Sequence, residues 1–160
     1  MLLTAGSGDA YRRGMFCDLR AGVILVAEDN PDEALLLQRA FKKAGLQVRI
    51  HICEDGDDAT AYLLGKEEFA DRVKFPYPRM LITDLKMPRC DGFELLERMR
   101  SEELVPKVVM SASGEDRDVR RAYKLGANCY FLKPGTFEEL VCIVRALGEF
   151  WGRVAVPLRG

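Results

Sequence analysis

Five polar residues of this chain stand directly after short, mostly apolar runs, and their types suit phosphoryl transfer. These residues are Glu28, Asp29, Asp84, Ser111 and Lys133. Three carboxylates gathered in one place repel one another, and a hard divalent cation relieves that repulsion. Oxygen ligands, without histidine or cysteine among them, favour Mg²⁺ over softer metals. A lysine and a serine beside the cation could hold a phosphoryl group, and an ionised aspartate can accept one.

The elements that would bring these residues together are short strands alternating with helices from residue 22 onward. Strands are expected at 23–27, 48–52, 80–84, 106–110 and 129–132, and helices at 31–44, 55–64, 92–100, 116–125 and 137–151. Such alternation predicts an α/β fold, with a doubly wound five-stranded parallel sheet. Ligands bind at the carboxyl ends of the strands in sheets of this kind. We therefore expect the five polar residues to form one site.

Each of these residues also has an ordinary explanation when it is taken alone. Glu28 and Asp29 could cap the helix that follows them, and Lys133 could be a solvated loop lysine. Asp84 alone would be a loop acid, and Ser111 alone carries little information. Their joint occurrence at the ends of four different predicted strands favours a functional site.

Length, composition and charge limit the classes of function. The 160 residues are 48% apolar and 31% charged, which is typical of one globular domain. The net charge of −1 gives no reason to expect nucleic-acid binding, and no apolar run is long enough to span a membrane. Five widely spaced cysteines without a CxxC pair predict reduced thiols and a cytoplasmic protein.

The motifs around the polar residues resemble the response regulator receiver family of two-component signalling. They are ILVAEDN at 24–30, ITDLKMP at 82–88 followed by DG at 91–92, VMSA at 109–112 and YFLKP at 130–134. The resemblance implies a flavodoxin-like (βα)5 fold with strand order 2-1-3-4-5. It predicts a receiver domain at 21–151, after a loose N-terminal arm at 1–20 and before a C-terminal tail at 152–160.

The family resemblance also implies a role for each residue of the site. Asp84 would be the phosphoacceptor, and Mg²⁺ would be held by Glu28, Asp29, Asp84 and the backbone carbonyl of Lys86. Ser111 occupies the hydroxyl position that follows the phosphoryl group, although threonine is commoner there. Lys133 would pair with Asp84 or its phosphoryl group.

Tyr130 occupies the position of a switch aromatic in the same family. Ser111 would move toward the phosphoryl group, and Tyr130 would turn inward in response. The alternative is that Tyr130 is an ordinary core aromatic.

The Asn30-Pro31-Asp32 helix start, the charged insert around 67–70 and the ending at 150–157 are similar to those of small receivers that work with phytochrome-type histidine kinases. The implied function is that of a single-domain response regulator rather than a dedicated enzyme. Its phosphoryl donor would be a sensor histidine kinase, such as a bacteriophytochrome. Because only residues 152–160 follow the last helix, we expect its output to be a downstream protein target or a phosphotransfer protein.

The last predicted helix, 137–151, is apolar over a wider arc than one sheet face requires. We expect the excess, together with the tail at 152–160, to form a homodimer interface. The alternative is that the tail packs on its own domain.

The adjacent acids Glu28 and Asp29, followed by Asn30-Pro31, and the complete set of five polar residues argue against three other functions. A receiver-like interaction module would not need the five polar residues. A haloacid-dehalogenase-type phosphatase would need two aspartates spaced two residues apart after the first strand, and a flavin carrier would need a phosphate-binding loop there.

Overall fold

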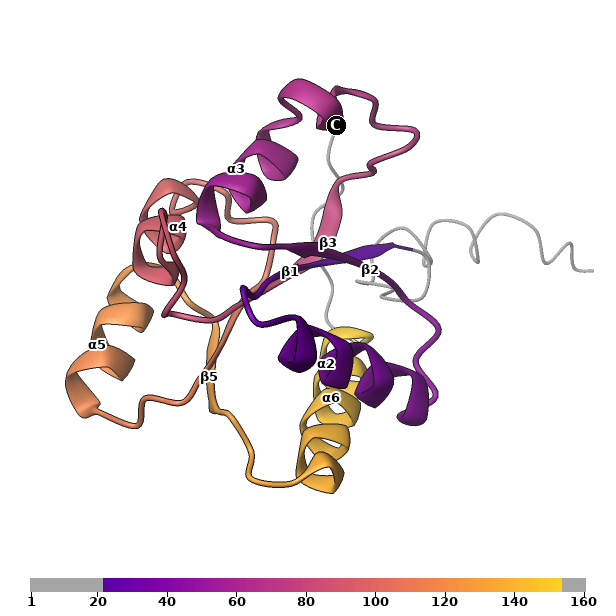
Figure 1. Ribbon diagram of the computed structural model, residues 1–160, viewed down its shortest axis with the longest axis vertical. Helices are drawn as coiled ribbons and strands as arrows, with labels where there is room; N and C mark the ends of the chain where they lie inside the picture. Colours follow the sequence, from indigo (N-terminus) through magenta and orange to yellow (C-terminus); the bar gives the residue numbers. More distant parts are fainter. Residues whose placement is uncertain (1–21, 154–160) are drawn as a thin grey trace, which may run out of the picture.

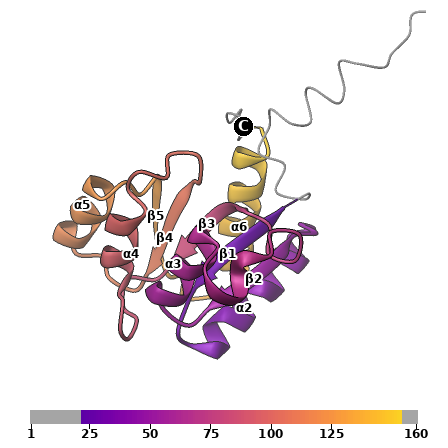
Figure 2. The same cartoon turned by 90° about the horizontal axis from the view of Figure 1, so that it is seen from above.

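Five parallel strands form a single sheet in the computed structural model, which describes residues 22–153. Their order is β2-β1-β3-β4-β5, as predicted (Figures 1 and 2). The strands are β1 Val23–Ala27, β2 Arg49–Cys53, β3 Pro78–Thr83, β4 Lys107–Ser111 and β5 Cys129–Leu132. This topology confirms the flavodoxin-like fold.

Helices cover both faces of the sheet (Figures 1 and 2). Helices α2 (Pro31–Lys43) and α6 (Phe137–Trp151) pack together on one face. Helices α3 (Gly56–Leu64), α4 (Gly92–Arg98) and α5 (Asp116–Lys124) lie on the other. None of the helices in this described part is long and apolar enough to cross a membrane.

Strand β1 is a continuous apolar run that lies inside the sheet, between β2 and β3. All five of its residues are buried. Ile24 and Val26 face the core beneath α2 and α6, whereas Val23, Leu25 and Ala27 face the core beneath α3 and α4. Because successive side chains of a strand point to opposite faces, a strand covered on both sides must be apolar throughout.

Two helix starts position the ends of the strands. The Asn30 side chain accepts hydrogen bonds from the backbone N–H groups of Asp32 (3.0 Å) and Glu33 (3.4 Å), so α2 begins directly after β1 and its acids. Asp91 and Glu94 form a reciprocal capping box at the start of α4.

Gly92, the first residue of α4, lies against the backbone that follows β3. A Cβ added at Gly92 would lie 2.0 Å from the carbonyl oxygen of Asp84. Only glycine therefore allows this helix to approach the strand end so closely.

The connector between α3 and β3 has structure of its own. It contains a 3₁₀ turn, η2 (Glu67–Ala70), and it buries Phe69. The Arg72 guanidinium donates hydrogen bonds to the carbonyls of Tyr62, Leu63 and Phe75, which fixes the connector to the end of α3. Sequence periodicity missed this turn because one buried aromatic carries no period.

Most of the apolar arc on α6 is used inside its own domain. Leu140, Val141, Val144 and Leu147 are buried in the core beneath α2, while Phe150 remains 60% exposed. The predicted arm at 1–20 and residues 154–160 of the predicted tail lie outside the described residues. The homodimer therefore stays a prediction.

Candidate functional site

Three carboxylates meet at the carboxyl edge of the sheet. Glu28 and Asp29 follow β1 and Asp84 follows β3, and the Asp84 backbone N–H donates to the Ala27 carbonyl at 3.0 Å. One oxygen from each of the three carboxyl groups lies within 4.8 Å of the others. Glu28 is buried and Asp29 is exposed. These oxygen donors fit a hard divalent cation, which would draw ligands from both strands.

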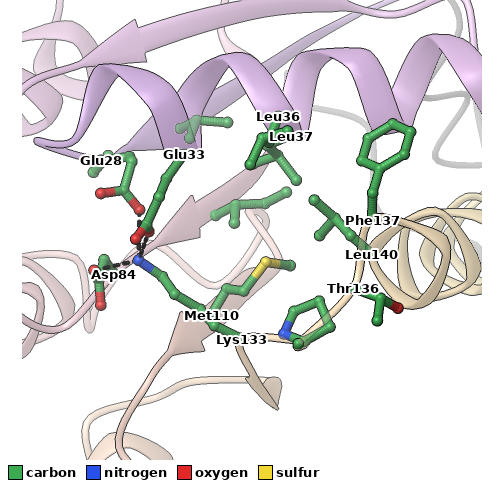
Figure 3. A pocket seen from close by; sticks show the side chains of 15 residues that line it. Glu28, Glu33, Leu36, Leu37, Asp84, Met110, Lys133, Thr136, Phe137 and Leu140 are labelled. Atoms are coloured by element: carbon green, nitrogen blue, oxygen red, sulfur yellow. Dashed lines mark hydrogen bonds and ion pairs between the residues drawn. The ribbon is translucent and has the colours of Figure 1, made fainter.

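Lys133 reaches this cluster from the end of β5. Its Nζ donates to Asp84 Oδ2 at 2.7 Å and to Glu28 Oε2 at 2.9 Å. It also forms an ion pair with Glu33, in the first turn of α2. Figure 3 shows the Lys133 ammonium among the carboxylates of Glu28, Glu33 and Asp84. An ammonium has three N–H donors, so each of them has a carboxylate partner.

Glu33 was not singled out as a site residue by the sequence. The available signal was its position in the first turn after the capping Asn30, because that cap begins α2 immediately after the acidic strand end.

A cavity of about 240 Å³ lies beside the ammonium of Lys133 (Figure 3). Apolar side chains form most of its wall, including Leu36, Leu37, Met110, Phe137 and Leu140. The charged groups of the site therefore adjoin a largely apolar space, where charge interactions are stronger than in water.

The remaining oxygen of Asp84 is held by the backbone. Oδ1 accepts a hydrogen bond from the Leu85 N–H at 2.6 Å, and the Lys86 N–H lies 3.5 Å away. Lys86 is thus in the loop directly beside the cluster. Its predicted use of a backbone carbonyl for the metal stays a prediction.

Burial and the lysine set the protonation of the cluster. Burial raises the pKa of Glu28 to about 7, although hydrogen bonds from Lys133 and the Asn30 backbone oppose this rise. Burial disfavours the charged form of Lys133, but its hydrogen bonds to Asp84, Glu33 and Glu28 outweigh burial and raise its pKa. Lys133 is therefore a permanent positive charge at neutral pH, whereas Glu28 is the carboxylate that a proton can occupy.

Cation binding is expected to strengthen as pH rises from 6 to 8, because a Glu28 pKa of about 7 means that binding must displace a proton at the lower pH. Above the pKa of Glu28 the dependence should flatten. Isothermal titration of the metal-free chain with Mg²⁺, in two buffers of different ionisation enthalpy, measures both affinity and proton release. An affinity that is constant over this range would contradict the expectation.

Ser111 and Tyr130 lie on the neighbouring strands β4 and β5, and both contact the backbone of Ser113 in the loop after β4. Ser111 ends β4, and its Oγ accepts a hydrogen bond from the Ser113 N–H at 3.2 Å. The half-buried Tyr130 of β5 donates its hydroxyl to the Ser113 carbonyl at 2.7 Å. Sequence reasoning missed Ser113, which links the two predicted switch residues through its backbone.

A parallel five-stranded sheet with an acidic cluster and a lysine at its carboxyl edge defines an α/β receiver domain. The model of the response regulator receiver domain family matches residues 24–145. This chain belongs to that family. Because the family is now known, the phosphatase and flavin-carrier alternatives have no observation in their favour.

Two of the relatives that match most of this chain are FilR2 and RPA3017. The probable methanogenesis regulatory protein FilR2 of Methanothrix harundinacea is 40% identical over 132 residues, which cover 81% of this chain and 83% of FilR2. The structure of response regulator RPA3017, described in red light signaling of R. palustris, is 32% identical with a TM-score of 0.80. The match covers 86% of this chain and 99% of RPA3017.

Response regulator Rcp1 of Synechocystis is 30% identical over 132 residues, 81% of this chain and 88% of Rcp1. The structure of its Mn²⁺-bound form gives a TM-score of 0.73 at 29% identity, and the match covers 87% of this chain and 99% of Rcp1. Bacteriophytochrome response regulators are also among the similar structures. The similarity to phytochrome-associated receivers is thereby confirmed, and the Rcp1 structure shows one such relative with Mn²⁺ bound.

Proposed function

We propose that this chain is a single-domain response regulator that accepts a phosphoryl group on Asp84 from a histidine kinase, with Mg²⁺ held by Glu28, Asp29, Asp84 and the carbonyl of Lys86. The observation that carries the proposal is the 2.7 Å contact between Lys133 Nζ and Asp84 Oδ2 beside a three-carboxylate cluster. A receiver-like module without phosphoryl chemistry would have no use for this arrangement.

In the proposed reaction, an Asp84 carboxylate oxygen attacks the phosphorus of a phosphohistidine. The new P–O bond forms as the P–N bond breaks, and the imidazole leaves with the electron pair and takes up a proton. A bound cation would neutralise charge on the transferring oxygens. Lys133 would balance the charge of the acyl phosphate, and the Leu85 N–H holds the other Asp84 oxygen in place. The chain thus assists its own phosphorylation, and we do not propose it as a dedicated enzyme.

The kinase proposed as donor is of the phytochrome type. Support comes from the likeness to RPA3017 and to the bacteriophytochrome response regulators. We keep the cytoplasm as the proposed location, since Cys53, Cys90, Cys129 and Cys142 are free thiols.

The proposed output is a protein contact or onward phosphotransfer through the face formed by α5, β5 and α6. Tyr123 of α5 is 48% exposed and Leu132 of β5 is 54% exposed, so this face offers apolar area to a partner. We also propose a homodimer, for which the exposed Phe150 on α6 is the supporting residue. A single monomer mass at all concentrations, with and without phosphorylation, would argue against the dimer.

The proposal is tested by incubating the chain with Mg²⁺ and acetyl phosphate and measuring its intact mass. We expect a gain of one phosphoryl group that disappears with a chelator. The product should be sensitive to hydroxylamine, which cleaves an acyl phosphate but not a serine phosphate, and peptide mapping should place it at Asp84. No mass gain with Mg²⁺ would refute the proposal.

Tyr130→Phe is expected to weaken the structural response of the loop after β4 to phosphorylation of Asp84. Phosphoryl acceptance should stay within about twofold of that of the unmodified chain. The substitution removes the hydroxyl that donates to Ser113 and costs roughly 1 kcal/mol of unfolding free energy. Amide chemical shifts before and after beryllofluoride measure the coupling. We expect shifts in β5 and α5 to become smaller than in the unmodified chain. Unchanged shifts would leave Tyr130 as a packing residue only.

A further inference from the structure

Glu33 is the one partner of Lys133 that lies outside the three-carboxylate cluster. It belongs to the first turn of α2 rather than to a strand end, and its side chain is 41% exposed. The Glu28 and Asp84 side chains, in contrast, are 9% and 10% exposed. Glu33 therefore contacts the lysine from the solvent side of the site.

The hydrogen bonds of Lys133 link Glu33 to phosphorylation at Asp84. The three N–H donors of Lys133 are shared among Glu28, Glu33 and Asp84. A phosphoryl oxygen on Asp84 can gain a direct hydrogen bond from Lys133 only if one of these bonds is released. Glu28 belongs to the cluster suited to a cation and Asp84 is the proposed acceptor, so Glu33 is the partner without another assigned role.

The negative charge of Glu33 also disfavours phosphorylation of Asp84. The site already holds more carboxylates than cationic side chains, since within residues 22–153 the ion-pair partner of Glu28, Glu33 and Asp84 is Lys133 alone. Phosphorylation replaces the single charge of a carboxylate with about −1.5 to −2. Glu33 would then repel the phosphoryl group on Asp84 and would also share its counter-ion, Lys133. The negative charge of Glu33 favours, in contrast, a cation bound at the cluster.

We propose that Glu33 is a positioning residue that holds Lys133 in the unphosphorylated chain and competes with the phosphoryl group for it. Glu33 thereby weakens the phosphorylated state. This inference rests on the proposed function of Asp84 as phosphoacceptor and adds a residue that sets how strongly the site holds its phosphoryl group.

The test is a titration with beryllofluoride at saturating Mg²⁺, followed by calorimetry or amide shifts. Glu33→Gln keeps the shape of the side chain but removes its charge, and we expect two- to fivefold tighter beryllofluoride binding, about the range for a partly exposed ion pair. Glu33→Asp keeps the charge but withdraws it from Lys133, and it should also bind beryllofluoride more tightly than the unmodified chain. Mg²⁺ affinity, measured separately, should not rise in either variant.

Asp32→Asn is the matched control, because it removes the same charge from the same helix turn. Among the described residues, the ion-pair partners of Lys133 do not include Asp32. Its beryllofluoride affinity should equal that of the unmodified chain. The inference is overturned if Glu33→Gln binds no more tightly than the unmodified chain, if Asp32→Asn reproduces its gain, or if Glu33→Asp binds like the unmodified chain.

Failure of this inference can be distinguished from failure of the proposed function. If the unmodified chain binds beryllofluoride and takes phosphate at Asp84, but Glu33→Gln does not differ, only the role of Glu33 is lost. If the unmodified chain binds no beryllofluoride and gains no mass, the function of Asp84 and the role of Glu33 both fall. Circular dichroism of each variant checks that the exposed substitution has left the fold intact.

Discussion

Asp84→Asn is expected to abolish phosphorylation of the chain by acetyl phosphate and by a kinase. An amide oxygen carries no full negative charge and is a poor nucleophile, so the attack on phosphorus loses its acceptor. The substitution leaves the backbone contacts of the Leu85 loop in place, because an asparagine oxygen can still accept the Leu85 N–H. Intact mass after incubation with Mg²⁺ and acetyl phosphate is the measurement.

The same variant should also lower Mg²⁺ affinity about tenfold or more, because the cluster loses one of three anionic ligands. Asp32→Asn serves again as a control that removes one acid outside the cluster. Residual phosphorylation of Asp84→Asn at another residue would show that acceptance is not confined to this carboxylate. An unchanged Mg²⁺ affinity would remove Asp84 from the metal ligands.

Gly92→Ala is expected to destabilise the fold by about 1–3 kcal/mol and to impair the site as well. The added Cβ would meet the Asp84 carbonyl oxygen at 2.0 Å and the Leu85 Cα at 2.8 Å. Both are backbone atoms, so relief requires α4 or the loop after β3 to move. Urea unfolding measures the stability, and Mg²⁺ titration reports the displacement of Asp84.

Gly135→Ala is the matched control for Gly92→Ala. Gly135 also lies beside the site, in the loop between β5 and α6, but a Cβ there would meet no atom within 4 Å. We expect its unfolding free energy to stay within about 0.5 kcal/mol of the unmodified chain. Equal losses in the two variants would indicate a general intolerance of loop substitution instead of a specific clash.

The sequence predicted the order of strands and helices because most strands are local apolar runs and four of the five α-helices of the described residues begin at a side-chain cap. The strand-end rule then placed Glu28, Asp29, Asp84 and Lys133 together without knowledge of any distance. Strand order 2-1-3-4-5 came from the family resemblance, since alternation alone does not determine which strands are neighbours.

The features that sequence reasoning missed depend on contacts between distant segments. Glu33 meets Lys133 across 100 residues of chain, and no local pattern encodes that contact. Ser113 matters through its backbone N–H and carbonyl, which any residue type would supply. The burial of Phe69 and the Arg72 hydrogen bonds were not predicted, because a lone buried aromatic and a guanidinium that binds carbonyls give no periodic signal.

His51 has a practical consequence for the study of phosphotransfer. It is the only histidine of the chain, and its ring lies against those of Tyr62, Phe69 and Phe75, with centroids 4.7, 5.5 and 5.9 Å away. Burial is the main reason that its pKa is lowered. In a mixture of this chain with a kinase, any phosphoimidazole signal can therefore be assigned to the kinase. Base-stable, acid-labile phosphate would then report on the donor and base-labile phosphate on the acceptor, without isotopic labelling of either protein.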